Sequence, residues 1–237
     1  MKTRNLSLKH GVARIYSIRA IALLLALSLT ALPSVSASAV QATDTATSYQ
    51  VVVNKTRPLT PKTYRPADLV QVPKYNPFAR IVRRDVSAAI VRLGNDMKAA
   101  NQETLIVQSG YRSYQSQTTI HNAKVHALGK LHGEKLAARP GYSEHQTGLA
   151  VDFAAKGVNT LQVSFAKTKA GVWLAANAYR YGFVLRYPSG KTAITGYSFE
   201  PWHFRFVGVE VATAMHDQAI STLEEYYSLP AAPNYLN

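Results

Sequence analysis

Residues 143–152, with the sequence SEHQTGLAVD, constrain the folding of this chain more than any other stretch. An imidazole, His145, and a carboxylate, Asp152, lie seven positions apart with Gly148 between them. Side chains on neighbouring turns of one helix face meet at spacings of three or four, so a spacing of seven that contains a glycine predicts a turn. We therefore expect a turn at Gly148 and then a strand over 149–153, with Asp152 directed inward.

A second stretch, Glu200-Pro201-Trp202-His203, supplies another imidazole and another carboxylate. Residues three apart in a straight strand face opposite sides, so Glu200 and His203 can share one site only if Glu200 lies in the loop before a strand. Two histidines with nearby carboxylates are typical of catalytic zinc sites, in which a carboxylate that does not bind the metal transfers protons. Taken alone, Asp152 also fits a helix cap or a surface ion pair, and His203 also fits a core histidine.

The chain contains no cysteine. This excludes a disulfide framework, a thiolate metal site and a cysteine nucleophile, so His, Asp and Glu must supply the ligands of any metal. Of the 237 residues, 47% are hydrophobic and 17% are charged, which favours a folded core over disorder.

The first 39 residues have the pattern of a secretory signal peptide. Five basic residues precede an apolar run over 20–32, and small residues follow it. The apolar run is shorter than the ~20 residues of a membrane-spanning helix, so cleavage near Ala39 is favoured over a retained membrane anchor. We therefore expect a signal peptide at 1–39, a short linker at 40–49 and a catalytic domain at 50–237 that begins with a proline-rich arm.

Hydrophobic periodicity predicts a domain that mixes helices and strands. Helices are expected at 85–101, 114–128, 170–181 and 209–227, and strands at 104–108, 149–153, 183–185 and 202–207. These elements lack the regular strand–helix alternation that is typical of a parallel sheet. The sequence therefore predicts an α+β fold, a single domain with a mainly antiparallel central sheet flanked by helices.

The formal net charge is +14, and it stays clearly positive when the basic leader is set aside. Behind the leader the basic residues are scattered, without the dense runs of Lys and Arg among aromatic residues that indicate a nucleic-acid-binding surface. For an exported protein we expect this charge to favour the anionic surface of the cell envelope, and we expect no nucleic acid as partner. No pattern indicates an obligate protein partner.

Three motifs follow one another along the chain: Ser109-Gly110-Tyr111-Arg112-Ser113-Tyr114, then Ser143-x-His145-x-x-Gly148-x-Ala150-x-Asp152, then Glu200-Pro201-Trp202-His203. Together they resemble the motifs of the VanY-type D-alanyl-D-alanine carboxypeptidases, which are zinc peptidases of the LAS type. The resemblance covers about residues 50–230, including the proline-rich arm. It implies a LAS or hedgehog-type D,D-peptidase fold and a hydrolase that acts on the cell wall.

The resemblance implies a zinc ion held by His145, Asp152 and His203, with Glu200 as the catalytic base. It also implies that Arg112 acts in catalysis by engaging the substrate, because a guanidinium can bind a terminal carboxylate through two parallel hydrogen bonds. Further substrate contacts are implied at Gln117, Ser143 and Tyr187. The implied substrates are peptidoglycan stem peptides that end in D-Ala, and the implied location is outside the cell, at the wall.

Several alternatives accompany this interpretation. Residues 164–167 (SFAK) and 191–193 (KTA) resemble fragments of the serine penicillin-binding signature, but they lie too close together and no Ser-x-Asn separates them. A non-catalytic peptidoglycan-binding module of the same fold is disfavoured, because a pure binder has no need of Glu200. Within the enzyme class, the three motifs leave open a D,D-carboxypeptidase, an L,D-carboxypeptidase, a dipeptidase and a cross-link endopeptidase.

Overall fold

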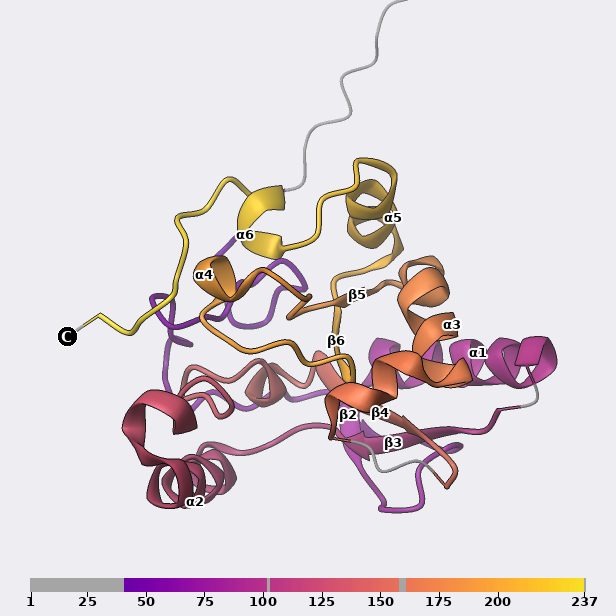
Figure 1. Ribbon diagram of the computed structural model, residues 1–237, viewed down its shortest axis with the longest axis horizontal. Coiled ribbons are helices and arrows are strands. Elements are labelled where there is room, and N and C mark those ends of the chain that lie inside the picture. The colour runs from indigo at the N-terminus through magenta and orange to yellow at the C-terminus, as the bar shows by residue number, and fades with distance from the viewer. Residues whose placement is uncertain (1–40, 102, 158–160, 237) are drawn as a thin grey trace, which may run out of the picture. The chain divides into compact units, whose positions relative to one another are not determined.

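The computed structural model describes residues 41–101, 103–157 and 161–236, so the predicted signal peptide lies outside the described residues. The helices are α1 (Arg84–Asn101), α2 (Tyr114–Gly133), α3 (Lys169–Asn177), α4 (Thr192–Thr195), α5 (Val209–Asp217) and α6 (Leu223–Tyr226) (Figure 1). Three 3-10 turns complete the helical elements, η1 (Glu144–Thr147), η2 (Val163–Lys167) and η3 (Ala178–Tyr181). No helix within the described ranges is long and apolar enough to cross a membrane.

The central sheet has four strands in the order β3-β4-β6-β5, and every neighbouring pair is antiparallel. The strands are β3 (Leu105–Ser109), β4 (Ala150–Ala155), β5 (Phe183–Leu185) and β6 (His203–Phe206). All four lie close to strands that the sequence predicts, because each is a short run of β-branched, aromatic or small apolar residues bounded by turns. This confirms the predicted α+β fold with an antiparallel sheet flanked by helices.

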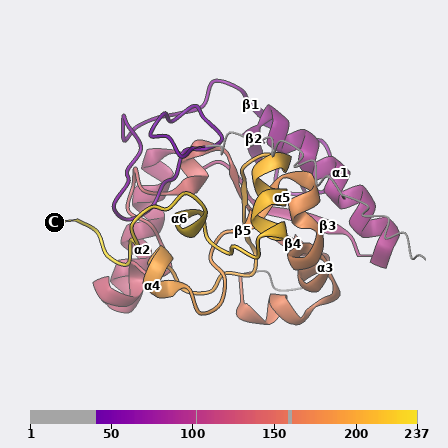
Figure 2. The ribbon, with the colours of Figure 1, turned by 90° about the horizontal axis from the view of Figure 1, so that it is seen from above.

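The two faces of the sheet have different roles. Val151, Phe153, Phe204 and Phe206 point to one face and form part of the main core with residues of α1 and α3. Burying each such side chain contributes about 1.5–3 kcal/mol, so this face supplies much of the folding energy. Figures 1 and 2 show α1 and α3 on this side, with α2 on the other. The polar residues between these apolar ones, among them Asp152, therefore point to the opposite face.

The segment predicted as a linker packs onto the domain. Ala46 is buried in the main core, and the Arg83 guanidinium donates to the backbone carbonyl of Thr47 at 2.7 Å. The described part of 40–49 therefore contacts the domain, while the division into a linker and a catalytic domain stays a prediction. The proline-rich arm that follows contains β1 (Leu69–Gln71), which pairs antiparallel with β2 (Ile81–Arg83).

Three helices differ in extent from the prediction, and the one expected over 170–181 is α3 followed by η3. The helix α2 continues to Gly133, although Gly129 has a φ of 74° and interrupts its regular geometry. The helix expected over 209–227 is divided into α5 and α6. A new N-cap begins α6, where the Thr222 hydroxyl accepts a hydrogen bond from the Glu225 backbone N–H. Neither glycine nor proline marks this division, so the hydrophobic periodicity alone predicted one helix.

Candidate functional site

Local backbone geometry brings together His145, Asp152 and His203. The turn η1 carries His145 and ends at Gly148, whose φ of 68° lets the chain reverse into β4. A Cβ at Gly148 would also lie only 3.0 Å from Arg83 Cγ. Asp152 of β4 and His203 of β6 are directly opposed in the antiparallel register, so their side chains point to the same face of the sheet.

The three side chains converge on one small volume. Asp152 Oδ1 lies 3.3 Å from His145 Nε2 and 3.2 Å from His203 Nδ1. One ligand atom from each residue lies within 4.8 Å of the other two, and all three residues are buried. His145 Nε2 and Asp152 Oδ1 have no hydrogen-bond partner among the described residues, which is unfavourable for buried polar atoms. Two imidazoles and a carboxylate are zinc ligands, so these residues fit a metal ion.

Contacts on the far side of each ring orient both imidazoles for metal binding. His145 Nδ1 lies 2.7 Å from the backbone carbonyl of Gly110. Since a carbonyl can only accept, Nδ1 carries the proton and the lone pair of Nε2 points toward Asp152. His203 is oriented in the opposite sense, with Nδ1 toward Asp152 and Nε2 at 3.6 Å from Glu144 Oε2. Carbonyls and carboxylates behind a ligating histidine are typical of metal sites.

The charges of the site favour an added cation. Burial opposes ionisation of Asp152, but His145, His203 and Arg112 outweigh it and hold the pKa of this carboxyl well below its ordinary value. Burial and the nearby Arg112 lower the pKa of His145 to about 4, so this imidazole is neutral and able to bind a metal. Burial alone would lower the pKa of His203, but Asp152 and Glu144 raise it to about 9. The carboxylates thus draw positive charge into the site.

Glu200 lies beside the three residues in the turn that precedes β6. Its Oε2 lies 3.7 Å from His203 Nδ1, and its backbone N–H donates to the carbonyl of Tyr187 at 3.1 Å. Burial raises the pKa of Glu200 to about 7, although His203 opposes the rise. A carboxyl group with this pKa can both accept and return a proton near neutral pH. Glu200 thus sits in the loop that the sequence predicts, where it shares a site with His203.

The other predicted site residues line the same cavity, which has a volume of about 30 Å³. They are Arg112, Gln117, Ser143 and Tyr187. Arg112 lies 3.3 Å from Asp152 Oδ2 and donates to Gln117 Oε1 at 3.1 Å, while the Gln117 amide donates to the carbonyl of Ala138 at 2.8 Å. Both ends of Gln117 are therefore engaged by protein groups.

Ser143 precedes η1 without capping it through its side chain, and the ring of Tyr187 lies 4.7 Å from that of His203.

A group of buried ions that no sequence pattern predicted lies behind the site. Glu144 accepts hydrogen bonds from Arg186 and Arg205 at 2.8 Å each, and Glu224 accepts two further bonds from Arg186. A sequence signal for these ions exists, because Arg205 lies between two phenylalanines in the strand HFRF and Arg186 directly follows the apolar strand FVL. An arginine in such a place is buried only when it is paired. This group supports the site through Glu144, which faces His203.

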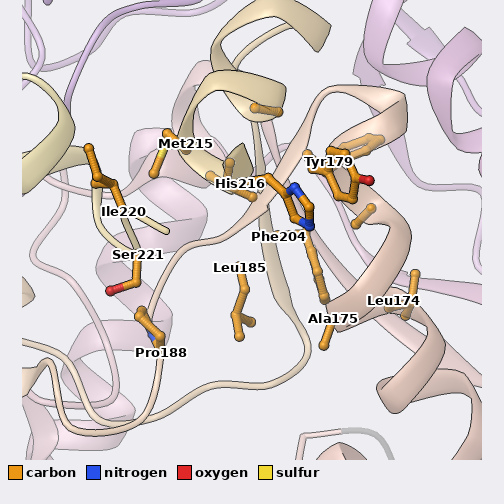
Figure 3. A pocket seen from close by; sticks show the side chains of 14 residues that line it. Leu174, Ala175, Tyr179, Leu185, Pro188, Phe204, Met215, His216, Ile220 and Ser221 are labelled. Atoms are coloured by element: carbon orange, nitrogen blue, oxygen red, sulfur yellow. The ribbon is translucent and has the colours of Figure 1, made fainter. Parts of the chain in front are cut away.

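A larger cavity of about 180 Å³ lies near the edge strand β5 and has a different character (Figure 3). Its lining is mainly apolar, with Leu174, Leu185 and Met215 among the residues that form it. The one imidazole in this lining, His216, stacks on Tyr179 at a ring distance of 3.7 Å. The described lining of this cavity therefore contains no group of ligands or acid–base residues comparable to the site around Asp152.

Comparisons with known proteins agree with this geometry. The family model described as VanY, D-alanyl-D-alanine carboxypeptidase, matches residues 79–209. The putative carboxypeptidase YodJ of Bacillus subtilis (strain 168) is 39% identical over 182 residues, which cover 74% of this chain and 66% of YodJ. The first three curated relatives are all matched over only 43% to 66% of their own length.

Two solved structures are similar in both fold and sequence. One is the LD-carboxypeptidase LdcB, with a TM-score of 0.70 and 37% identity over 76% of this chain and 86% of that chain. The other is a variant of the vancomycin-resistance D,D-pentapeptidase VanY in complex with Zn(II), with a TM-score of 0.63 and 36% identity over 74% of this chain and 97% of that chain. The fold and the His/Asp/His group define a peptidase of the LAS type. Within that class, the chain belongs to the VanY D-alanyl-D-alanine carboxypeptidase family.

Proposed function

We propose that this protein is a zinc-dependent carboxypeptidase that removes the terminal D-alanine from peptidoglycan stem peptides. The observation that carries the proposal is the grouping of three buried metal ligands, two of which, His145 and His203, line one cavity together with Glu200 and Arg112. The relatives support the substrate class, since two of them are D-alanyl-D-alanine carboxypeptidases of Enterococcus faecalis and Enterococcus faecium.

His145 Nε2, His203 Nδ1 and the Asp152 carboxylate would hold the metal. Zinc supplies a bound water of lowered pKa and polarises the carbonyl of the scissile bond. The orientation of the two imidazoles supports this assignment, because the nitrogens that face Asp152 are those left free by the contacts with Gly110 and Glu144.

Glu200 would carry the proton through the reaction. As the attacking water bonds to the carbonyl carbon, one of its protons passes to Glu200, and the same proton later passes to the amine nitrogen of the departing D-alanine. A pKa of about 7, caused mainly by burial, suits both transfers. Tyr187 supports this role by accepting the Glu200 backbone N–H, which fixes the turn.

Arg112 would recognise the free carboxylate that marks the end of the substrate. Arg112 lines the cavity and donates a hydrogen bond to Gln117, which is itself anchored to Ala138. We therefore propose that Gln117 positions Arg112. Ser143 and Tyr187 would then be the remaining residues that contact the substrate directly. The small cavity suits a small terminal residue such as D-alanine.

We also propose that the protein acts outside the cell. The basic and apolar leader supports export, and the positive net charge suits an anionic envelope. N-terminal sequencing of the protein from the culture medium or the wall fraction tests this step, with a new terminus near Val40 as the expected result. Protein found only in the cytoplasm with Met1 intact would contradict it.

Mass spectrometry of muropeptides tests the activity. The purified protein is incubated with pentapeptide and tetrapeptide stems, with and without a chelator, and zinc is then restored. We expect the protein to remove one D-alanine from a stem. The chelator should abolish this activity, and added zinc should restore it. The stem that is consumed distinguishes D,D- from L,D-carboxypeptidase activity, and release of a dipeptide or opening of a cross-link would indicate the other peptidase alternatives.

The variant Glu200→Ala separates an enzyme from a binding module. It should retain zinc, because Glu200 is outside the ligand group, but it should lose turnover. The variant His203→Ala should lose both. If the wild-type protein holds zinc and consumes neither stem, the carboxypeptidase proposal is wrong and the binding module or the endopeptidase takes its place.

A further inference from the structure

A third cavity, of about 190 Å³, contains a concentration of positive charge. Its lining comes from the end of α2 and the loop after it, from the arm and from the segment after α6. The four basic residues in that lining are Lys55, Lys130, Lys135 and Arg139. The only acidic residue of the described lining is Glu134, so the cavity has a clear excess of positive charge.

The single carboxylate is already engaged. Glu134 Oε1 lies 2.7 Å from Arg139 Nε and 3.6 Å from His121 Nε2. The Arg139 guanidinium is also fixed over the ring of Tyr235 at 4.0 Å, and the Tyr235 hydroxyl accepts the Arg139 backbone N–H at 2.8 Å. Glu134 therefore balances Arg139, and the described lining offers no second carboxylate to balance its three lysines.

Lys55 is the most unusual of these lysines, because only 4% of it is exposed. Its Nζ donates to the backbone carbonyl of Pro233 at 3.2 Å and lies 5.0 Å from the ring of Tyr197. Burial lowers the pKa of Lys55, and the nearby Lys135 and Arg139 lower it further against the opposing effect of Glu134. A buried ammonium group among other cations is stabilised when an anion enters beside it.

We propose that this cavity binds a phosphate group, either as free phosphate or within a phosphate ester. Lysines act as mobile point charges that surround a phosphate from several directions, and the side-chain amide of Asn234 adds a further donor to the lining. A singly charged carboxylate would leave more of the positive charge unbalanced. The proposal does not depend on the carboxypeptidase activity.

The basic cavity lies next to the catalytic cavity, which suggests what phosphate binding could do for the protein. Leu136, Ala137 and Ala138 line the catalytic cavity, while Lys135 and Arg139 on either side of them line the basic cavity. One short segment therefore forms a wall of both cavities. A phosphate-bearing polymer held here would keep the catalytic cavity near the envelope material to which that polymer belongs.

Calorimetric titration at low ionic strength tests the proposal, with inorganic phosphate and a short glycerol-phosphate oligomer as separate probes. The test variant is Lys130→Ala combined with Lys135→Ala. The control is Lys74→Ala combined with Lys98→Ala, which removes the same charge from exposed positions elsewhere. Loss of charge-assisted hydrogen bonds should weaken binding by about tenfold or more in the test variant.

The control variant should change the affinity by less than about twofold, since its lysines contribute only screened long-range attraction. The tighter of the two probes identifies the source, with the oligomer indicating a polymer and phosphate indicating a free anion. Equal weakening in both variants would mean diffuse attraction to a basic protein, and it would overturn the proposal. Absence of saturable binding by both probes in the wild-type protein would overturn it as well. Thermal unfolding of each variant confirms that it is folded.

Discussion

Two groups of buried charges meet at Glu144, and they differ in how their charge is balanced. On one side Glu144 Oε1 accepts bonds from Arg186 and Arg205, and Glu224 binds the far end of Arg186 at 2.7 Å and 2.9 Å. On the other side Glu144 Oε2 lies 3.6 Å from Nε2 of His203, which belongs to the His/Asp/His group. We call the first set, Glu144, Arg186, Arg205 and Glu224, the ion network.

The ion network is complete within the protein. Two guanidinium groups face two carboxylates, and all four side chains are at most 1% exposed. The His/Asp/His group instead contains Asp152, whose pKa is depressed, and His203, whose pKa the nearby carboxylates raise to about 9. Its carboxylate attracts positive charge, which either a proton on His203 or a bound metal ion can supply. The ion network therefore stabilises the fold by itself, whereas we expect a metal ion to complete the His/Asp/His group.

The largest expected effect follows from breaking the ion network. Glu144→Ala leaves Arg186 and Arg205 buried without their shared partner, which should lower the free energy of unfolding by about 3–5 kcal/mol. Urea unfolding measures this loss. The control Glu210→Ala removes an exposed carboxylate in the first turn of α5 and should cost less than about 1 kcal/mol. Similar losses in both variants would show that the ion network contributes little.

The next effect tests whether a metal completes the His/Asp/His group. Zinc at a free concentration about 100-fold above its Kd should raise the free energy of unfolding by about 2.7 kcal/mol, because it binds only the folded protein. Asp152→Asn should lose most of this gain, whereas Glu200→Gln should keep it. Unfolding curves with and without zinc provide the measurement. A gain in Asp152→Asn equal to that of the wild type would place the zinc elsewhere.

A smaller effect concerns the contact that joins the two groups. Glu144→Gln should weaken zinc binding by about 10- to 100-fold, since it removes the charged partner of His203 Nε2. The matched control is Glu224→Gln, which disturbs the same ion network without approaching His203. Competition with a chelator of known affinity measures the difference. Equal loss of zinc affinity in both variants would mean that a general disturbance of the ion network, rather than loss of the contact with His203, weakens zinc binding.

The smallest effect is the acid sensitivity of the ion network. Burial opposes ionisation of Glu224, but Arg186 and Asn54 outweigh it and lower its pKa from the ordinary 4.5. The stabilisation is therefore fully present above pH 4.5 and is lost as the pH falls through the folded-state pKa. One such group changes the stability by at most about 1.4 kcal/mol per pH unit.

Urea unfolding at a series of pH values between neutral and acidic conditions tests this prediction. Glu224→Gln should show a flatter decline below pH 4.5 than Glu210→Gln, because it lacks the titrating carboxyl. The same decline in both variants would mean that other carboxyl groups determine the acid limit of stability.

Much of the site could be predicted because its information is local. Gly148 between His145 and Asp152 predicts the turn, and the alternation of strand residues predicts which side chains share a face. Glu200 before Pro201 likewise predicts the loop position that the structure shows. These inferences depend on backbone preferences that act over a few residues, and such preferences can be inferred from a single sequence.

The ion network could not be predicted in the same way. Its members come from η1, from the residue after β5, from β6 and from α6, so no spacing or periodicity relates Arg186 to Glu224. The packed segment around Ala46 was missed for the same reason, since its small residues become part of the core only through tertiary contacts. For Gln117 the sequence predicted the place but not the partners, which are Arg112 and Ala138.

The ion network also has a consequence for the order in which the protein matures. Arg205 binds the carbonyls of Tyr49 and Val51, and Glu224 accepts a further bond from Asn54. Both distant ends of the described chain must therefore be present before all these buried charges are matched. A chain without residue 224 would have to bury Arg186 with only one of its two carboxylate partners, Glu144. The buried charges around Arg186 are therefore matched only when the segment that carries Glu224 is present together with η1.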